Sequence, residues 1–116
     1  GTHGSTFGGN PVACAGGLAV LERVQSEGFF DEVNRKAEYI RQRLSECGEV
    51  KSVSGLGLMI GIELKTKTAA DVSRRAFEEG LLVLTAKDKV RLLPPLTISD
   101  SELSDGMDIL IKVLEE

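Results

Sequence analysis

The sequence is poor in aromatic residues, cysteines and positive charge. Of its 116 residues none is Trp, one is Tyr and four are Phe, so we expect no binding surface built from stacked aromatic rings. The two cysteines, Cys14 and Cys47, are too few for a disulfide framework or a zinc site, which favours a reducing, cytoplasmic location. Lys plus Arg total 14 against 18 for Asp plus Glu, a net charge of -4 that argues against a nucleic-acid partner.

Long apolar runs are also missing. No stretch reaches the roughly 18 apolar residues of a membrane-spanning helix, and the neutral, glycine-rich start does not match a signal peptide. We therefore expect no membrane partner. Hydrophobic residues at 41% and charged residues at 28% are typical of a globular domain.

The first 21 residues carry no Asp, Glu, Lys or Arg, and six of the 13 glycines lie within the first 17. Because a free N-terminus is normally solvated, such a segment is expected to lie against other protein. We expect the chain to be the C-terminal part of a longer protein. Residues 1–28 would be a segment and helix leading from a large domain, and residues 29–116 a small C-terminal domain.

Local patterns predict the order α-α-β-β-α-β-β-α. Helices are indicated by an Asn-Pro start, by two capping boxes at Thr68 and Ser99, and by apolar stripes of helical spacing. The predicted helices cover about 11–27, 31–47, 69–79 and 100–114, and the predicted strands cover 50–54, 57–64, 81–85 and 89–93. The fold class is α+β, with helices packed on a largely antiparallel sheet of three or four strands.

Two segments could bind anions. Ser5 and Thr6 place hydroxyl groups just ahead of a helix N-terminus, which attracts anions, although an ordinary capped loop would look the same. Arg91 lies mid-strand between Val90 and Leu92, and is either a solvated surface group or a fork for a carboxylate. The residues alone leave both alternatives open.

Other candidates have structural interpretations. The glycine pattern at 55–61 departs from the dinucleotide-binding spacing and is followed by a strand, so it indicates a hairpin. His3 has no carboxylate or cysteine at metal or triad spacing. The seven lysines lie in polar contexts, and both cysteines are interpreted as small core residues. We therefore predict no catalytic residue and no metal ligand in this chain.

Three blocks carry a family resemblance: HGSTFGGNPVACA at 3–15, SGLGLMIGIEL at 54–64 and VRLLPPLTIS at 90–99. Together they resemble the class-III aminotransferases, which depend on pyridoxal 5′-phosphate. The resemblance implies the small C-terminal domain of a fold-type-I enzyme, working as a homodimer with shared active sites. It also implies that the catalytic lysine lies upstream of this chain.

The resemblance assigns roles residue by residue. The residue matching Thr6 reaches the cofactor phosphate of the other subunit, the one matching Ser5 lies beside the substrate, and the one matching Arg91 binds the substrate α-carboxylate. Lys87 stands where many members have Gly after the Ala, which puts that turn's geometry in question.

The third block favours the ornithine-type branch of the family. The implied reaction moves an amino group from N-acetylornithine to 2-oxoglutarate in arginine biosynthesis. Ornithine, succinylornithine or 4-aminobutyrate are alternative donors. A stand-alone binding or assembly module without catalysis is an alternative of another class, and the gene sequence upstream of Gly1 would discriminate between them.

Overall fold

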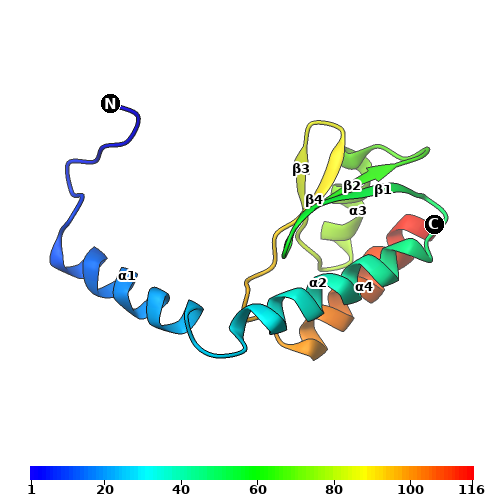
Figure 1. Cartoon of the computed structure of the whole chain (residues 1–116). Helices are drawn as coiled ribbons and strands as arrows, with labels where there is room; N and C mark the ends of the chain where they lie inside the picture. The colour runs from blue at the N-terminus through cyan, green and yellow to red at the C-terminus, as the bar shows by residue number, and fades with distance from the viewer. The chain divides into compact units, whose positions relative to one another are not determined.

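The computed structural model describes all 116 residues, which form four helices and one four-stranded sheet (Figure 1). The element order confirms the predicted α+β class. No helix is long and apolar enough to cross a membrane. In chain order the elements are α1 (Pro11–Val24), α2 (Phe29–Ser45), β1 (Val50–Leu56), β2 (Met59–Leu64), α3 (Ala69–Glu78), β3 (Leu84–Ala86), β4 (Lys89–Leu92) and α4 (Asp100–Glu115).

The chain divides into two compact units, Gly1–Glu32 and Val33–Glu116, which are described separately. This division falls inside α2, a few residues after the expected boundary at residues 28–29. The assignment of those two segments to separate domains of a longer protein stays a prediction.

In the N-terminal unit, α1 begins as the Asn-Pro pair predicts. The Asn10 side chain accepts a hydrogen bond of 2.9 Å from the backbone N–H of Ala13, and Pro11 occupies the first helical position. The helix ends at Val24, three residues earlier than expected, and contains no buried residue. Cys14 is therefore exposed, and its interpretation as a core residue is wrong for this structure, whereas Cys47 is buried as expected.

The C-terminal unit is built on a sheet of order β1-β2-β4-β3, in which all neighbouring strands are antiparallel. β1 and β2 form a hairpin that closes at the Leu56–Met59 pair. Gly55 makes this hairpin possible, because its φ of +113° suits only glycine and a Cβ there would overlap the carbonyl oxygen of Met59. β3 is shorter than the predicted strand at 81–85, because only Leu84 and Thr85 of that segment, together with Ala86, pair with β4.

Three helices cover one face of this sheet and bury its apolar side chains. α2 and α4 run side by side and parallel in Figure 1, and ion pairs join Arg35 to Asp100 at 2.8 Å and Arg43 to Asp108 at 2.7 Å. α3 contacts β3, β4 and α4. Fully buried side chains from both layers form the core, among them Ile40, Leu44, Ile60, Ile62, Val90 and Leu110.

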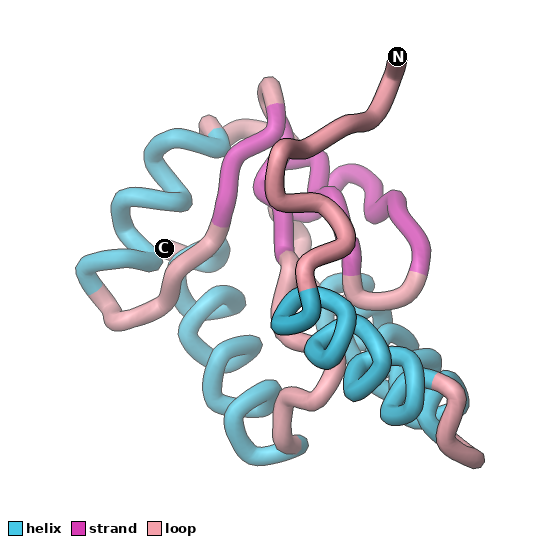
Figure 2. Tube along the Cα trace, turned by 90° about the vertical axis from the view of Figure 1, so that its left-hand side faces the viewer, coloured by secondary structure: helices cyan, strands magenta, loops and turns pink.

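Short polar contacts fix the connections between these elements. Thr68 and Ser99 cap α3 and α4 as predicted. Glu49, ahead of β1, accepts hydrogen bonds from the backbone N–H groups of Thr66 and Lys67, both at 2.7 Å, and from the Thr66 hydroxyl at 2.8 Å. These bonds stabilise the ionised carboxylate and lower the pKa of Glu49 to about 2. Figure 2 shows the pink loops that join the helices, in cyan, and the strands, in magenta.

Candidate functional site on the outer face of the sheet

Arg91 lies on the face of the sheet that the helices leave open. Its strand neighbours Val90 and Leu92 are buried, so the alternation of β4 turns Arg91 to the opposite side, as the sequence predicts. Arg91 is paired with Gly61 of β2 and with Leu84 of β3. Gly61 is in turn paired with Ser54 of β1, so these four residues form one row across the sheet.

The Arg91 guanidinium has no acidic partner in the structure. Its Nη2 donates to the sulfur of Met59 at 3.1 Å, a weak acceptor, and no carboxylate lies within ion-pair distance. Four other arginines, by contrast, pair with Asp or Glu: Arg35, Arg43, Arg74 and Arg75. Arg91 therefore presents its donors to an external acceptor.

A hollow of about 470 Å³ surrounds Arg91 on this outer face. Residues of all four strands line it, with Lys89 as its second charged residue. Gly61 forms part of the floor, because a Cβ at that position would come within 3.1 Å of the Ser54 hydroxyl. Its size suits a small molecule.

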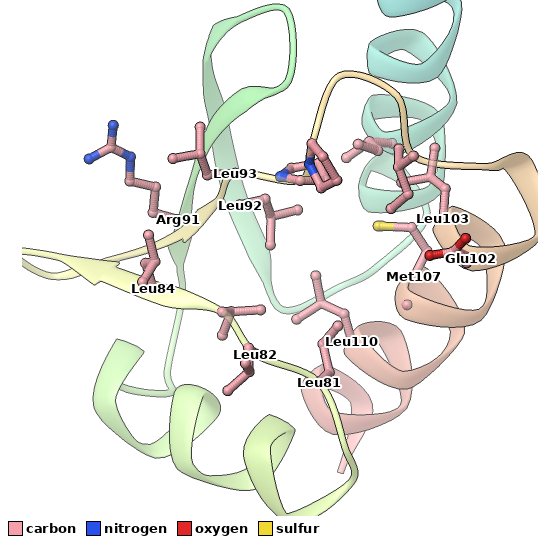
Figure 3. Close-up of a pocket in the computed structure, with 16 residues that line it drawn as sticks. Leu81, Leu82, Leu84, Arg91, Leu92, Leu93, Glu102, Leu103, Met107 and Leu110 are labelled. Carbon is pink, nitrogen blue, oxygen red and sulfur yellow. The ribbon is translucent and has the colours of Figure 1, made fainter. Parts of the chain in front are cut away.

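A second cavity of about 420 Å³ lies on the core side of the sheet, between the β3–β4 region and α4 (Figure 3). Leucines and Met107 dominate its lining, and Arg91 also contributes to it, but the guanidinium of Arg91 points away from the cavity. Its one carboxylate, Glu102, accepts a hydrogen bond from Ser99 in the cap of α4. The polar chemistry around Arg91 therefore belongs to the outer hollow.

Ser5 and Thr6 lie in the N-terminal unit, in the turn that precedes α1. Both residues are exposed, and neither hydroxyl has a hydrogen-bond partner in the chain. The Ser5 carbonyl accepts from the Gly8 N–H at 3.2 Å, and the first turn of α1 contains no acidic residue. Free hydroxyl donors beside an uncharged helix N-terminus fit the oxygen atoms of a phosphate group.

The single histidine forms no metal site, and one of the lysines has a structural role. His3 is exposed, and no group of three or more His, Cys, Asp or Glu side chains is placed to hold a metal ion. The expectation that all seven lysines lie in polar, solvated contexts is wrong for Lys36, which is only 8% exposed. Its Nζ donates to the Leu96 carbonyl at 3.3 Å, which ties α2 to the loop after β4.

The family comparison agrees with the fold and with these motifs. The family model described as aminotransferase class-III matches residues 1–114. The chain is 49% identical over its whole length to the acetylornithine aminotransferase of Haemophilus ducreyi and 40% identical to that of Caldanaerobacter subterraneus. It covers 30% and 31% of the lengths of those two proteins.

Solved structures give the same result. The N-acetylornithine aminotransferase of Stenotrophomonas maltophilia matches with a TM-score of 0.84 and 31% identity, over 91% of this chain and 31% of that one. The ornithine aminotransferase of Toxoplasma gondii matches with a TM-score of 0.83 and 33% identity, over 99% of this chain and 29% of that one. The fold is a small α+β domain found within aminotransferases. The chain belongs to the class-III aminotransferase family, and it spans just under a third of the length of these relatives.

Sequence reasoning missed three residues around Arg91. Lys89 precedes it by two positions, so strand alternation could have placed both cations on one face. Met59 and Gly61 are brought to Arg91 only by the pairing of β2 with β4, which no local pattern predicts.

Proposed function

We propose that this chain is part of a pyridoxal 5′-phosphate-dependent aminotransferase that moves an amino group from N-acetylornithine to 2-oxoglutarate in arginine biosynthesis. Identity of 40–49% to acetylornithine aminotransferases over the whole chain supports this donor. Ornithine is the second candidate, supported by the match to the Toxoplasma gondii ornithine aminotransferase.

The observation that carries the proposal is the free guanidinium of Arg91 on the outer sheet face. A guanidinium offers two parallel N–H donors that match both oxygens of a carboxylate. The flanking buried residues, Val90 and Leu92, hold the backbone of β4 in place, so the fork starts from a fixed position. In the proposed enzyme Arg91 binds the α-carboxylate of the substrate and thereby orients the Cα–H bond that is broken.

The N-terminal unit would contribute to cofactor binding. When bound, pyridoxal 5′-phosphate supplies an aldehyde that captures the substrate amine and a ring that accepts electrons from it. Thr6 would donate its hydroxyl to the phosphate across a homodimer interface, and Ser5 would lie beside the substrate. The lysine that carries the cofactor would lie outside these 116 residues, in the remaining part of a cytoplasmic enzyme.

Replacement of Arg91 in the longer enzyme, meaning the aminotransferase of which this chain is proposed to be a part, tests this function. Arg91→Lys is expected to lower kcat/KM for N-acetylornithine nearly as much as Arg91→Ala, by about 2–4 kcal/mol in transition-state stabilisation, because an ammonium cannot reproduce the fork. An amine without an α-carboxylate should lose little. The matched control is Arg74→Lys on the exposed face of α3, which should leave kcat/KM unchanged.

Near wild-type efficiency of Arg91→Lys with the carboxylate substrate would show that Arg91 is a surface residue. The donor is decided separately by comparing kcat/KM of the longer wild-type enzyme for N-acetylornithine and for ornithine. A clear preference for ornithine would replace the first candidate by the second.

A further inference from the structure

The two methionines of the chain differ sharply in exposure. Met59, at the start of β2, is 51% exposed, whereas Met107, in α4, is 3% exposed and belongs to the core. Peroxides oxidise a methionine thioether to the sulfoxide, and the oxidant must reach the sulfur to do so. Met59 is therefore open to this modification, and Met107 is an internal reference that the fold protects.

Met59 lies directly beside Arg91 on the outer face of the sheet. Gly61 is paired with Arg91, and Met59 stands two positions before Gly61, so Met59 is a diagonal neighbour of Arg91 on the same face. The Met59 sulfur accepts from Nη2 of Arg91 at 3.1 Å, and both residues line the outer hollow. A chemical change at this sulfur therefore acts first on the guanidinium of Arg91.

Oxidation would change the acceptor that the guanidinium meets. A thioether sulfur is a weak hydrogen-bond acceptor, whereas a sulfoxide is polar and its oxygen carries partial negative charge. A hydrogen bond from a charged donor is stronger than one between neutral groups, so the guanidinium of Arg91 suits this oxygen. The hollow of about 470 Å³ provides space for the added atom.

We propose that Met59 is a site of oxidative modification and that the oxygen of its sulfoxide holds the guanidinium of Arg91. The oxidant is a peroxide such as hydrogen peroxide. A lone pair of the Met59 sulfur attacks one peroxide oxygen, the O–O bond breaks, and the sulfur gives up two electrons. The oxygen now on sulfur loses its proton to the departing hydroxide, which leaves as water.

One consequence rests on the proposed function. If Arg91 binds the substrate carboxylate, the sulfoxide oxygen competes with that carboxylate for the same N–H donors. Oxidation of Met59 then weakens substrate binding, and enzymatic reduction of the sulfoxide restores it. The modification and its contact with Arg91 do not depend on this role.

The first measurement locates the oxidation. The 116-residue chain is treated with dilute hydrogen peroxide, and its peptides are followed by mass spectrometry over time. Met59 is expected to become the sulfoxide roughly tenfold faster than Met107 in the folded chain, and both should react at similar rates in concentrated urea, where neither is protected. Equal rates in the folded chain, or faster oxidation of Met107, would overturn the proposal.

The second measurement is the reactivity of Arg91 towards phenylglyoxal, a reagent that modifies free guanidinium groups. Oxidation of the wild-type chain is expected to slow the modification of Arg91 at least about threefold. The modification of Arg74, on α3, should be unchanged. In Met59→Leu the same peroxide treatment should have no effect on Arg91. An unchanged rate at Arg91 after oxidation of Met59, or equal slowing in Met59→Leu, shows that the sulfoxide does not hold Arg91 and overturns the proposal.

These measurements are independent of the proposed function, because neither follows the transfer of an amino group. Near wild-type efficiency of Arg91→Lys in the longer enzyme would remove the role of Arg91 in substrate binding and leave both rates in this chain as expected. Failure of either measurement here leaves the kinetics of the Arg91 variants as the test of the proposed function.

Discussion

The β1–β2 hairpin should depend on Gly55 more than on any charged contact around it. Gly55→Ala places a side chain at a φ of +113°, in a region that costs about 1–3 kcal/mol for residues other than glycine. The new Cβ would also overlap the carbonyl oxygen of Met59, which is backbone and cannot rotate away. The hairpin must then shift and disturb its pairing with Ile60, so we expect a total loss of at least about 3 kcal/mol.

Two further glycines separate backbone strain from steric overlap. Gly80 has a φ of +91° but open space around its Cβ position, so Gly80→Ala should cost only the strain, about 1–2 kcal/mol. Gly48 has neither constraint, and Gly48→Ala should change stability by less than about 1 kcal/mol. The free energies of unfolding are measured by urea denaturation followed by circular dichroism, with the m-value checked for each variant.

The expected order of the losses in free energy of unfolding is Gly55→Ala, then Gly80→Ala, then Gly48→Ala. If Gly55→Ala costs no more than Gly80→Ala at equal m-value, the close approach of Met59 to Gly55 is not a fixed feature of the hairpin. The structural account of the glycine pattern at 55–61 would then be wrong.

Four other predictions concern the turn, the acid stability, the core and the cofactor. Lys87 is the one residue other than glycine with a positive φ, +57°, so Lys87→Gly should raise the free energy of unfolding by about 0.5–1 kcal/mol and raise Tm. Folding lowers the pKa of Glu49 from about 4.5 to about 2. The ionised carboxylate therefore stabilises the fold above pH 4.5, and this stabilisation is lost as the pH falls through 2. The difference in urea midpoint between wild type and Glu49→Gln should be constant near neutral pH and vanish in strong acid. Leu110→Ala, at 1% exposure, should cost about 2–5 kcal/mol in thermal or urea unfolding, whereas Leu56→Ala, at 89% exposure, should cost under about 0.5 kcal/mol. In the longer enzyme, Thr6→Ala should raise the Kd of pyridoxal 5′-phosphate roughly 10- to 150-fold in a fluorescence titration, because one charge-assisted hydrogen bond is lost. An unchanged Kd would show that Thr6 is an ordinary loop residue.

The elements that the sequence predicts best are those with local causes. The caps at Thr68 and Ser99 act within three residues, and the structure shows each hydroxyl accepting from the expected backbone N–H. In the strand predicted over 57–64, apolar residues stand at every second position, and two of them, Ile60 and Ile62, are the buried side chains of β2. The strand predicted at 81–85 begins three residues before β3, because β3 is defined by its pairing with β4, a tertiary contact that the local sequence does not contain.

In the candidate site, too, the features with local causes are predictable from the sequence and those that depend on strand pairing are not. The outward direction of Arg91 follows from two buried neighbours and could be predicted. Its contact with Met59 could not, since 32 positions separate the two residues and only the order of the sheet brings them together. For Lys36 the sequence predicts an exposed side chain, but the structure buries it. A charged residue on a helix can be buried when its ammonium donates to a carbonyl group, here that of Leu96.

The two segments proposed to bind ligands are also segments that expose apolar side chains. Phe7, next to Thr6, is 78% exposed, and Leu56 and Met59, which line the hollow of Arg91, are 89% and 51% exposed. Exposed apolar groups that gather beside unpaired polar donors are typical of surfaces that bind another molecule or another part of the protein. The chain also spans under a third of its relatives. Both facts support the proposal that Thr6, in the N-terminal unit, and Arg91, in the C-terminal unit, each act within a longer protein.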